Sequence, residues 1–349
     1  MSKIYANPFS WGEPVKGSHY VQRSSDQAFI LDRIEDQFQV LLTGQRGTGK
    51  TSLMKHVLDK QPIASLHFDL PFIVSRQGLF ELLTEGLINH FPKADKDPRL
   101  QAIREDPSQT KLKSLFDVYY EQVEASNQTF VIIWDEFQHL AKFKTDIIGE
   151  VKQALKGRRG IVHFFVSHRK DVLQTAFGRG SQSFFKQQAL YELGNLEEKI
   201  CLQYLSRRFR RMGLSDFDLP AAVYKVTHGQ ALFTQRLAYT VAQVWLEGTT
   251  TRLLQRSVAK LLKERNILFT YIWDQFGLNE KRLLIGLASG FSRPTELGFI
   301  AQFGLSATST AHNTVIKLVR EGWVVNRDEG YHIYDSLFLS WLQKREGVS

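Results

Sequence analysis

The sequence has little of what marks a secreted, membrane-spanning or disordered protein. Its 349 residues include one cysteine, Cys201, which cannot form an internal disulfide. The longest purely apolar run beside a motif is Phe130–Trp134, far short of the roughly 18 residues of a membrane-spanning helix. Glycine and proline contribute only 24 and 9 residues, and the opening MSKIYANPFSWGEP lacks a signal-peptide pattern. We therefore expect a cytoplasmic protein with two or three globular domains and no membrane segment.

The positive charge is confined to the middle of the chain. The net charge is +9, yet residues 1–150 contain 17 Lys/Arg against 20 Asp/Glu. Residues 151–265 contain 20 against 8, and residues 266–349 contain 8 of each. An anionic partner, if the protein has one, is therefore expected to meet residues 151–265.

The first half of the chain alternates apolar runs with segments of helical periodicity. The runs lie at 38–42, 63–68, 130–134 and 161–166. Helices are expected near 27–36, 51–60, 77–91, 111–125, 146–156 and 170–177, with an exposed connection at 92–109. Continuous apolar runs are typical of strands that helices bury on both faces. This half therefore predicts an α/β domain with a parallel sheet, residues 1–194.

Helical periodicity takes over after this domain. Helices are expected near 196–212, 220–227, 231–246 and 252–276, and then near 280–288, 294–302 and 307–321. Two short strands follow, near 323–326 and 331–334. We interpret residues 195–276 as a helical lid domain and residues 277–349 as a winged helix-turn-helix domain.

The strongest motif is a phosphate-binding loop, GQRGTGKT, which starts at Gly44. It follows a predicted strand and precedes a predicted helix, as G-x-x-x-x-G-K-[ST] loops do. Its glycines let backbone amides approach the phosphates, Lys50 supplies a positive charge, and the Thr51 hydroxyl can ligate Mg²⁺. The predicted nucleotide-binding residues of this segment are Gly44, Gln45, Arg46, Gly47, Thr48, Gly49, Lys50, Thr51 and Ser52. With this loop, the expected fold is a P-loop NTPase sheet with a helical lid and a C-terminal winged helix.

The second motif is the run FVIIWDE, in which two carboxylates end a buried strand. The carboxyl ends of parallel strands share one edge of the sheet with the phosphate loop. Asp135 is therefore expected to hold Mg²⁺, mainly through water, and Glu136 to orient and deprotonate the attacking water. A P-loop kinase does not need such a Glu, so the pair favours hydrolysis of ATP over phosphoryl transfer.

Polar residues after the strand at 161–166 are candidates for sensing the nucleotide. Ser167 or His168 could contact the γ-phosphate, although polar residues often close a buried strand without such a role. Arg179, in the segment AFGRG, could reach a nucleotide in its own or a neighbouring subunit, or be a solvated loop residue.

Together these segments resemble the archaeal-type P-loop ATPases, which are related to AAA+ and STAND proteins. The opening NPFSWGEPVKGSHYVQR is similar to a segment that lies over the adenine in that family. The resemblance implies that Asn7, Pro8, Phe9 and Arg23 belong to the nucleotide pocket.

Two later segments carry the resemblance further and depart from it in detail. THGQALFTQRLA is similar to the family's lid motif, with Ala231 where Pro is usual, so the first helical turn is less rigid. Leu232 stands where origin-recognition ATPases have an Arg, which leaves Arg236 as the nearest candidate sensor. DSLFLSWL resembles the closing D-P-x-F-x-x-W segment, with Ser336 in place of Pro.

The sequence thus predicts an ATP-binding protein and Mg²⁺-dependent ATP hydrolase that switches contacts with DNA or an acidic protein partner. The winged helix itself is neutral, and the basic residues Arg207, Arg208, Arg210 and Arg211 either form a backbone-binding track or a solvated helix face. A nucleotide-gated scaffold and a DNA-binding regulator with little hydrolysis are the alternatives.

Overall fold

The computed structural model describes residues 6–105, 111–327 and 329–348. The chain forms two compact units. The sheet unit comprises residues 23–45 and 49–194, and the helical unit comprises the described residues of 1–22, 46–48 and 195–349.

The sheet unit is built on five parallel strands. They are β1 (Gln39–Thr43), β2 (Ala64–Asp69), β3 (Phe130–Asp135), β4 (Ile161–Val166) and β5 (Gln188–Glu192). Their spatial order is β2-β3-β4-β1-β5, so β1 lies between β4 and β5 and β2 forms one edge. The carboxyl ends of all five strands therefore point to the same edge of the sheet, where ligands bind in open α/β folds.

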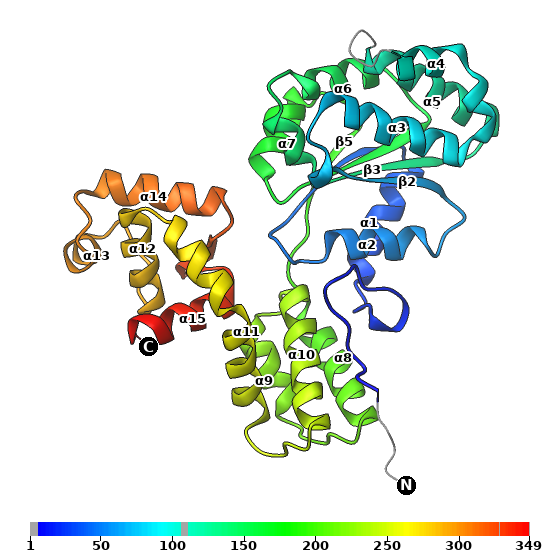
Figure 1. Ribbon diagram of the computed structural model, residues 1–349. Helices are drawn as coiled ribbons and strands as arrows, with labels where there is room; N and C mark the ends of the chain where they lie inside the picture. Colours follow the sequence, from blue (N-terminus) through cyan, green and yellow to red (C-terminus); the bar gives the residue numbers. More distant parts are fainter. Residues whose placement is uncertain (1–5, 106–110, 328, 349) are drawn as a thin grey trace. The chain divides into compact units, whose positions relative to one another are not determined.

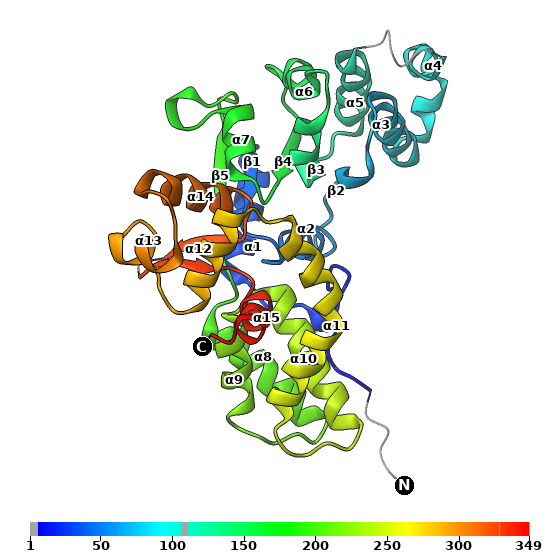
Figure 2. The same cartoon turned by 60° about the vertical axis from the view of Figure 1, so that its left-hand side comes forward.

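Helices cover both faces of this sheet, with α1 and α2 on one face and α3, α5, α6 and α7 on the other (Figures 1 and 2). The helices of this unit are α1 (Ser24–Glu35), α2 (Lys50–Leu58), α3 (Arg76–His90), α4 (Pro98–Glu105), α5 (Leu112–Ser126), α6 (Ile147–Leu155) and α7 (Lys170–Phe177). Because β3 and β4 are covered on both sides, all of their residues are buried. Fully buried aromatic rings fill the core between the sheet and helices α3, α5, α6 and α7, among them Trp134, Phe116 and Phe165.

The helical unit contains eight α-helices and one hairpin among its described residues. They are α8 (Glu198–Arg211), α9 (Leu219–Thr227), α10 (Ala231–Leu246), α11 (Leu253–Gln275), α12 (Leu278–Ala288), α13 (Leu297–Phe303), α14 (Thr308–Arg320), β6 (Val324–Arg327), β7 (Gly330–Ile333) and α15 (Ser336–Glu346). One continuous apolar core runs through all of these helices and also takes in Phe9 and Val21. The three helices α12, α13 and α14 followed by the β6–β7 hairpin form the winged helix expected from the sequence.

Among the described residues, one strand and two α-helices were not predicted from the sequence. They are β5, α4 and α15. The expected exposed connection at 92–109 instead contains a 3-10 helix, Pro92–Lys96, and α4, while residues 106–110 lie outside the described part of the chain. The division into three domains stays a prediction, since the lid and winged-helix segments share one core here.

In the ranges that the structure describes, no helix is both long and apolar enough to cross a membrane.

Candidate nucleotide site

The phosphate loop occupies the sharp turn between β1 and α2. Gly44 (φ 143°) and Gly49 (φ 97°) have backbone conformations that residues other than glycine rarely adopt. Gly49 stands directly before α2, whose first residue is Lys50. The Lys50 side chain is 6% exposed, and its Nζ donates to the carbonyls of Gly44 (2.8 Å) and Gln45 (3.0 Å). The ammonium group is therefore held inside the curve of the loop, as phosphate binding requires.

The other predicted loop residues flank this curve. Thr51 and Ser52 lie in the first turn of α2, while residues 46–48 group with the helical unit. There Gly47 O accepts from Leu232 N at 2.9 Å. The peptide N–H groups of the loop and the N-terminus of α2 give this turn the character of an anion site.

Asp135 at the end of β3 meets the beginning of α2. Thr51 Oγ1 donates to Asp135 Oδ2 at 2.6 Å, and Asp135 is 4% exposed. The other carboxylate oxygen, Oδ1, accepts from Glu136 N at 3.0 Å. The structure thus brings together the two residues that the sequence assigns to Mg²⁺.

The donor set fits a Mg²⁺ ion of the P-loop type. A hydroxyl and a carboxylate oxygen adjoin the loop, and Mg²⁺ in such sites takes one or two protein oxygens with phosphate oxygens and water. Among the described residues no group of three His, Cys, Asp or Glu side chains could hold a metal by itself.

Glu136 is held by two neighbouring side chains. Its backbone is left-handed (φ 56°), and its Oε2 lies 3.0 Å from His168 Nδ1 and accepts from Gln138 Nε2. Burial alone would raise the pKa of Glu136, but the hydrogen bonds from His168 and Gln138 and the charges of His168 and Lys50 lower it to about 2. The carboxylate is therefore ionised at neutral pH, and these contacts restrain its orientation.

The end of β4 supplies the support for Glu136. Ser167 Oγ donates to Gln138 Oε1 at 2.5 Å, and Gln138 in turn donates to Glu136. The predicted sensors Ser167 and His168 therefore both lie beside the predicted base, Ser167 through Gln138 and His168 directly. Their role in sensing phosphate stays a prediction. Arg179 lies exposed in the loop after α7 and its role also stays a prediction.

Sequence reasoning missed two polar residues on the edge strand β2. His67 Nε2 lies 3.1 Å from Asp135 Oδ2, and Asp69 stands opposite Asp135 in the β2–β3 register. Burial and the nearby Asp135 carboxylate raise the pKa of Asp69. A signal was present for Asp69, because the run ASLHFD ends in a carboxylate just as the strand of FVIIWDE does.

Arg23 precedes the first helix of the sheet unit. Its Nη1 donates to Asp26 Oδ2 (3.2 Å) and to the Gly194 carbonyl (3.1 Å), and the residue is 9% exposed. These contacts fix the Arg23 guanidinium at the beginning of α1. The contact of Arg23 with adenine stays a prediction.

The N-terminal segment lies on the lid helices of the helical unit. Asn7 Nδ2 donates to the Tyr239 carbonyl at 2.9 Å. Phe9 is 3% exposed, with its ring 5.0 Å from that of Phe209 and 6.1 Å from that of Tyr204. The Phe9 ring is therefore a core residue of this unit, and the place of Asn7, Pro8 and Phe9 in the nucleotide pocket stays a prediction.

Two arginines expected at the surface or at the nucleotide are engaged by this same segment. Arg208 is 3% exposed and donates to the Pro8 carbonyl, so it is not part of a solvated basic face. The Arg236 guanidinium lies 4.3 Å over the ring of Trp11, and its Nη2 is 3.5 Å from Glu264. Burial, and next the charge of Arg265, lower the pKa of Arg236. A sensor role for Arg236 stays a prediction and would require it to leave these contacts.

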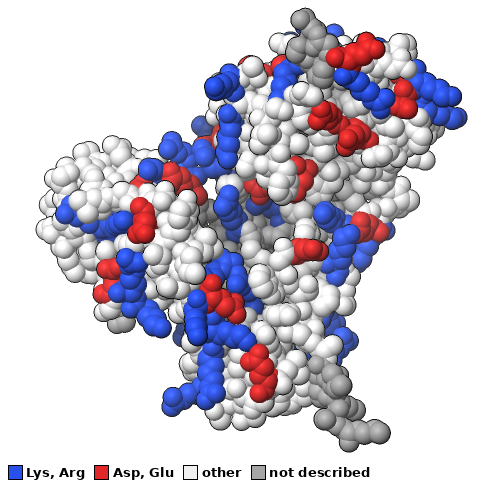
Figure 3. Space-filling model, in the orientation of Figure 1, with Lys and Arg blue, Asp and Glu red and all other residues white. Residues whose placement is uncertain are grey.

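The basic stretch at 151–265 is partly neutralised within each unit. Ion pairs join Arg158 to Asp117, Arg169 to Asp171, Lys170 to Glu192 and Lys260 to Glu247. Exposed cations remain on α8, namely Lys199, Arg207, Arg210 and Arg211. Lys and Arg side chains also gather over the part of the helical unit that holds α9 and α11 (Figure 3).

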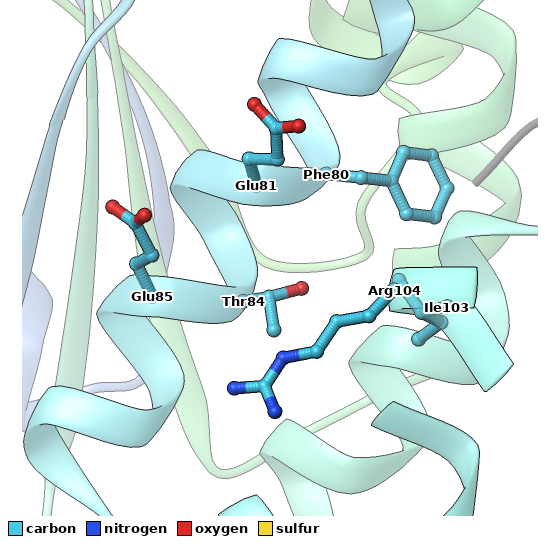
Figure 4. Close-up of a pocket in the computed structure, with 6 residues that line it drawn as sticks. All are labelled: Phe80, Glu81, Thr84, Glu85, Ile103 and Arg104. Carbon is cyan, nitrogen blue, oxygen red and sulfur yellow. The ribbon is translucent and has the colours of Figure 1, made fainter. Parts of the chain in front are cut away.

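A cavity of about 220 Å³ lies in the sheet unit between α3 and α4. Figure 4 shows Glu81 and Glu85 along α3 and Arg104 reaching from α4 beneath Thr84. None of the site residues predicted from the sequence lines this cavity.

The parallel sheet, the loop around Lys50 and the paired Thr51 and Asp135 define a P-loop nucleotide-binding fold. Comparisons agree: residues 34–173 match a AAA domain and residues 267–344 match a probable winged helix domain. No curated protein sequence matches the chain.

Solved structures share the fold across nearly the whole chain. The Walker-type ATPase PABY2304 of Pyrococcus abyssi is 15% identical, with a TM-score of 0.74 over 94% of this chain and 97% of that one. The ORC2 protein of Aeropyrum pernix is 12% identical, with a TM-score of 0.58 over 93% of each chain. The ORC1 protein of the same organism, solved in complex with DNA, is 13% identical, with a TM-score of 0.53 over 95% of this chain and 94% of that one. The protein therefore has the fold of an archaeal-type P-loop ATPase, with a AAA domain followed by a C-terminal winged helix domain.

Proposed function

We propose that the protein binds ATP with Mg²⁺ and hydrolyses it, and that the cycle switches its contacts with DNA or an acidic protein. The observation that carries the proposal is the meeting of Lys50, Thr51 and Asp135 where β1, α2 and β3 come together. This combination has the charge and the oxygen donors for a nucleoside triphosphate and its metal ion.

The geometry supports the following roles for the residues of the site. Lys50 would exchange its two carbonyl partners for phosphate oxygens, and Thr51 and Asp135 would hold Mg²⁺, which neutralises phosphate charge when bound. Glu136 follows Asp135 directly and stands at the same strand end. It would accept the proton of the attacking water after its carboxylate is freed from His168 and Gln138, since a carboxylate with a pKa of about 2 is a weak base.

A partner is suggested by the second half of the chain. The ORC1 structure with the same fold was solved with DNA, and a winged helix is present here. In addition, three arginines of α8 are exposed in the helical unit. These observations support DNA as the first partner to test, with an acidic protein surface as the second.

The test is a pair of substitutions with a matched control. We expect Glu136→Gln to retain ATP binding and lower turnover by about two to four orders of magnitude, because it removes the proposed base and keeps its size. We expect Lys50→Ala to weaken ATP binding itself. Glu124→Gln makes the same chemical change on an exposed position of α5 and should leave both quantities unchanged.

Phosphate release in single-turnover assays and binding of a fluorescent ATP analogue measure the two effects separately. Normal hydrolysis by Glu136→Gln would show that the base is another group. Normal ATP binding by Lys50→Ala would contradict the assignment of the loop.

A further inference from the structure

We propose that His67, on the edge strand β2, is a positioning residue that fixes the Asp135 carboxylate for the metal ion. The inference rests on the proposed function, since it concerns the Mg²⁺ that would accompany ATP. Nothing in the phosphate-loop motif or in FVIIWDE points to β2, so this residue adds a third structural element to the site.

The contacts of Asp135 carry the proposal. Its Oδ2 accepts from Thr51 Oγ1 at 2.6 Å and lies 3.1 Å from His67 Nε2, while its Oδ1 accepts from Glu136 N at 3.0 Å. The side chains of His67 and Asp135 are 21% and 5% exposed. The carboxylate is thus held by a side chain of α2, a side chain of β2 and the backbone N–H of the next residue. Because the site is nearly buried, little water is present to replace a lost donor.

The surroundings of Nδ1, the second ring nitrogen of His67, indicate which of the two nitrogens carries the hydrogen. Within the described chain, His67 Nδ1 is buried and has no hydrogen-bond partner. A proton on Nδ1 would be buried and unpaired, whereas a proton on Nε2 has the carboxylate as its acceptor. We infer that Nε2–H donates to Asp135 Oδ2.

The register of the sheet explains why a β2 residue can reach a β3 carboxylate. Asp69 lies opposite Asp135, and His67 lies two residues earlier on β2, on the same face of the strand as Asp69. The side chain of His67 therefore extends along the strand towards the carboxyl edge of the sheet. Asp69 adds negative charge near Asp135, and repulsion between the two carboxylates favours rotation of the Asp135 side chain away from Asp69. The hydrogen bond from His67 opposes that rotation.

Loss of this hydrogen-bond donor should weaken the binding of the metal ion rather than the binding of the nucleotide. Groups that hydrogen-bond a metal ligand typically change metal affinity by about 10- to 100-fold. Phosphate contacts of the loop and of Lys50 do not involve His67, so binding of ATP without metal should remain as it was.

The experiment compares His67→Leu, His67→Gln and the surface control His312→Leu in the full chain. Affinity for a fluorescent ATP analogue is measured over a series of Mg²⁺ concentrations and in EDTA, and Mn²⁺ binding to the nucleotide complex is followed by electron paramagnetic resonance. We expect His67→Leu to raise the half-saturating Mg²⁺ and Mn²⁺ concentrations about tenfold or more, with affinity in EDTA changed less than twofold. His67→Gln should recover most of the metal affinity, because its amide nitrogen reaches about as far as Nε2.

Unchanged metal dependence in His67→Leu would overturn the proposal, and so would an equal loss of affinity with and without metal. If His67→Leu does not fold, His67→Gln and His67→Asn replace it, since the shorter Asn amide reaches only as far as Nδ1 and should behave as the defective variant. Equal metal affinities in these two would also overturn the proposal. Wild-type protein that binds ATP identically with Mg²⁺ and EDTA would instead contradict the proposed function.

Discussion

Phe9 provides the sharpest test of whether the N-terminal segment serves the nucleotide or the core. The ring is 3% exposed and contacts Phe209 and Tyr204 of α8. Truncating a buried Phe to Ala typically costs about 3–5 kcal/mol, since transfer free energy is lost and a cavity remains. For a unit of this size, about 3 kcal/mol corresponds to a fall of roughly 6–12 °C in melting temperature.

The assay combines calorimetry of the nucleotide-free protein with hydrogen exchange of α8 and α10. We expect Phe9→Ala to lower the melting temperature of the helical unit by that amount and to speed exchange in both helices. Phe9→Leu is the matched control, since it keeps apolar volume in the same place and should cost less than about 1.5 kcal/mol. If Phe9→Ala keeps its stability and instead loses ATP affinity, the ring is a nucleotide contact and the reasoning from burial is refuted.

Two further predictions concern pH and salt. The pKa of Glu136 is lowered to about 2 in the fold, so its contribution to stability is present above its usual value of 4.5 and is lost as the pH falls from 4.5 towards 2. Urea unfolding at pH 7 should show Glu136→Gln less stable by about 1–2 kcal/mol, a figure reduced for partial exposure, and that gap should close by pH 2; a constant gap would contradict the ionised contact. If duplex DNA is the partner, its affinity should fall steeply with salt, and replacing Arg207, Arg210 and Arg211 by Gln should lower the slope of log K against log salt by up to about three. An unchanged slope would exclude this face of α8 as the DNA contact.

The elements predicted best from the sequence are those with a local cause. β3 and β4 are continuous apolar runs because helices bury them on both faces, and that pattern is visible without the fold. The phosphate loop is equally local, since its glycines, Lys50 and Thr51 lie within eight residues.

Two of the missed elements, β5 and α4, have weak local patterns and depend on their neighbours. β5 is an edge strand of mixed polarity, none of whose residues is buried, and it exists through its pairing with β1. α4 begins at Pro98, a residue that breaks helix interiors but is tolerated in a first turn, and it buries only Leu100 and Ile103. Neither segment offers a periodic apolar signal of useful length.

The site shows the same division between local and distant causes. Asp135 and Glu136 could be predicted because they end one apolar run. His67 and Gln138 could not, because the first depends on the register of β2 against β3 and the second on the 3-10 helix that follows Glu136. The contact of the Phe9 ring with α8 could not be predicted for a related reason, since it joins residues that lie 200 positions apart in the chain.

The distribution of exposed cations bears on where an anionic partner would bind. On the winged helix, Lys317 of α14 is paired with Glu280 of α12 and lies near Glu321, so one of the two cations in the last turn of this helix is already neutralised. On α8, Arg207, Arg210 and Arg211 are exposed, and Arg210 lies 5.4 Å from the ring of Phe217, which is 78% exposed. A cationic helix face beside an exposed aromatic ring, as on α8, is suited to binding a phosphate backbone. The face of α14 is less suited, because one of its cations is already paired. We therefore expect an anionic partner to engage α8 before it engages α14 of the winged helix. We expect the winged helix to add shape rather than charge to that contact.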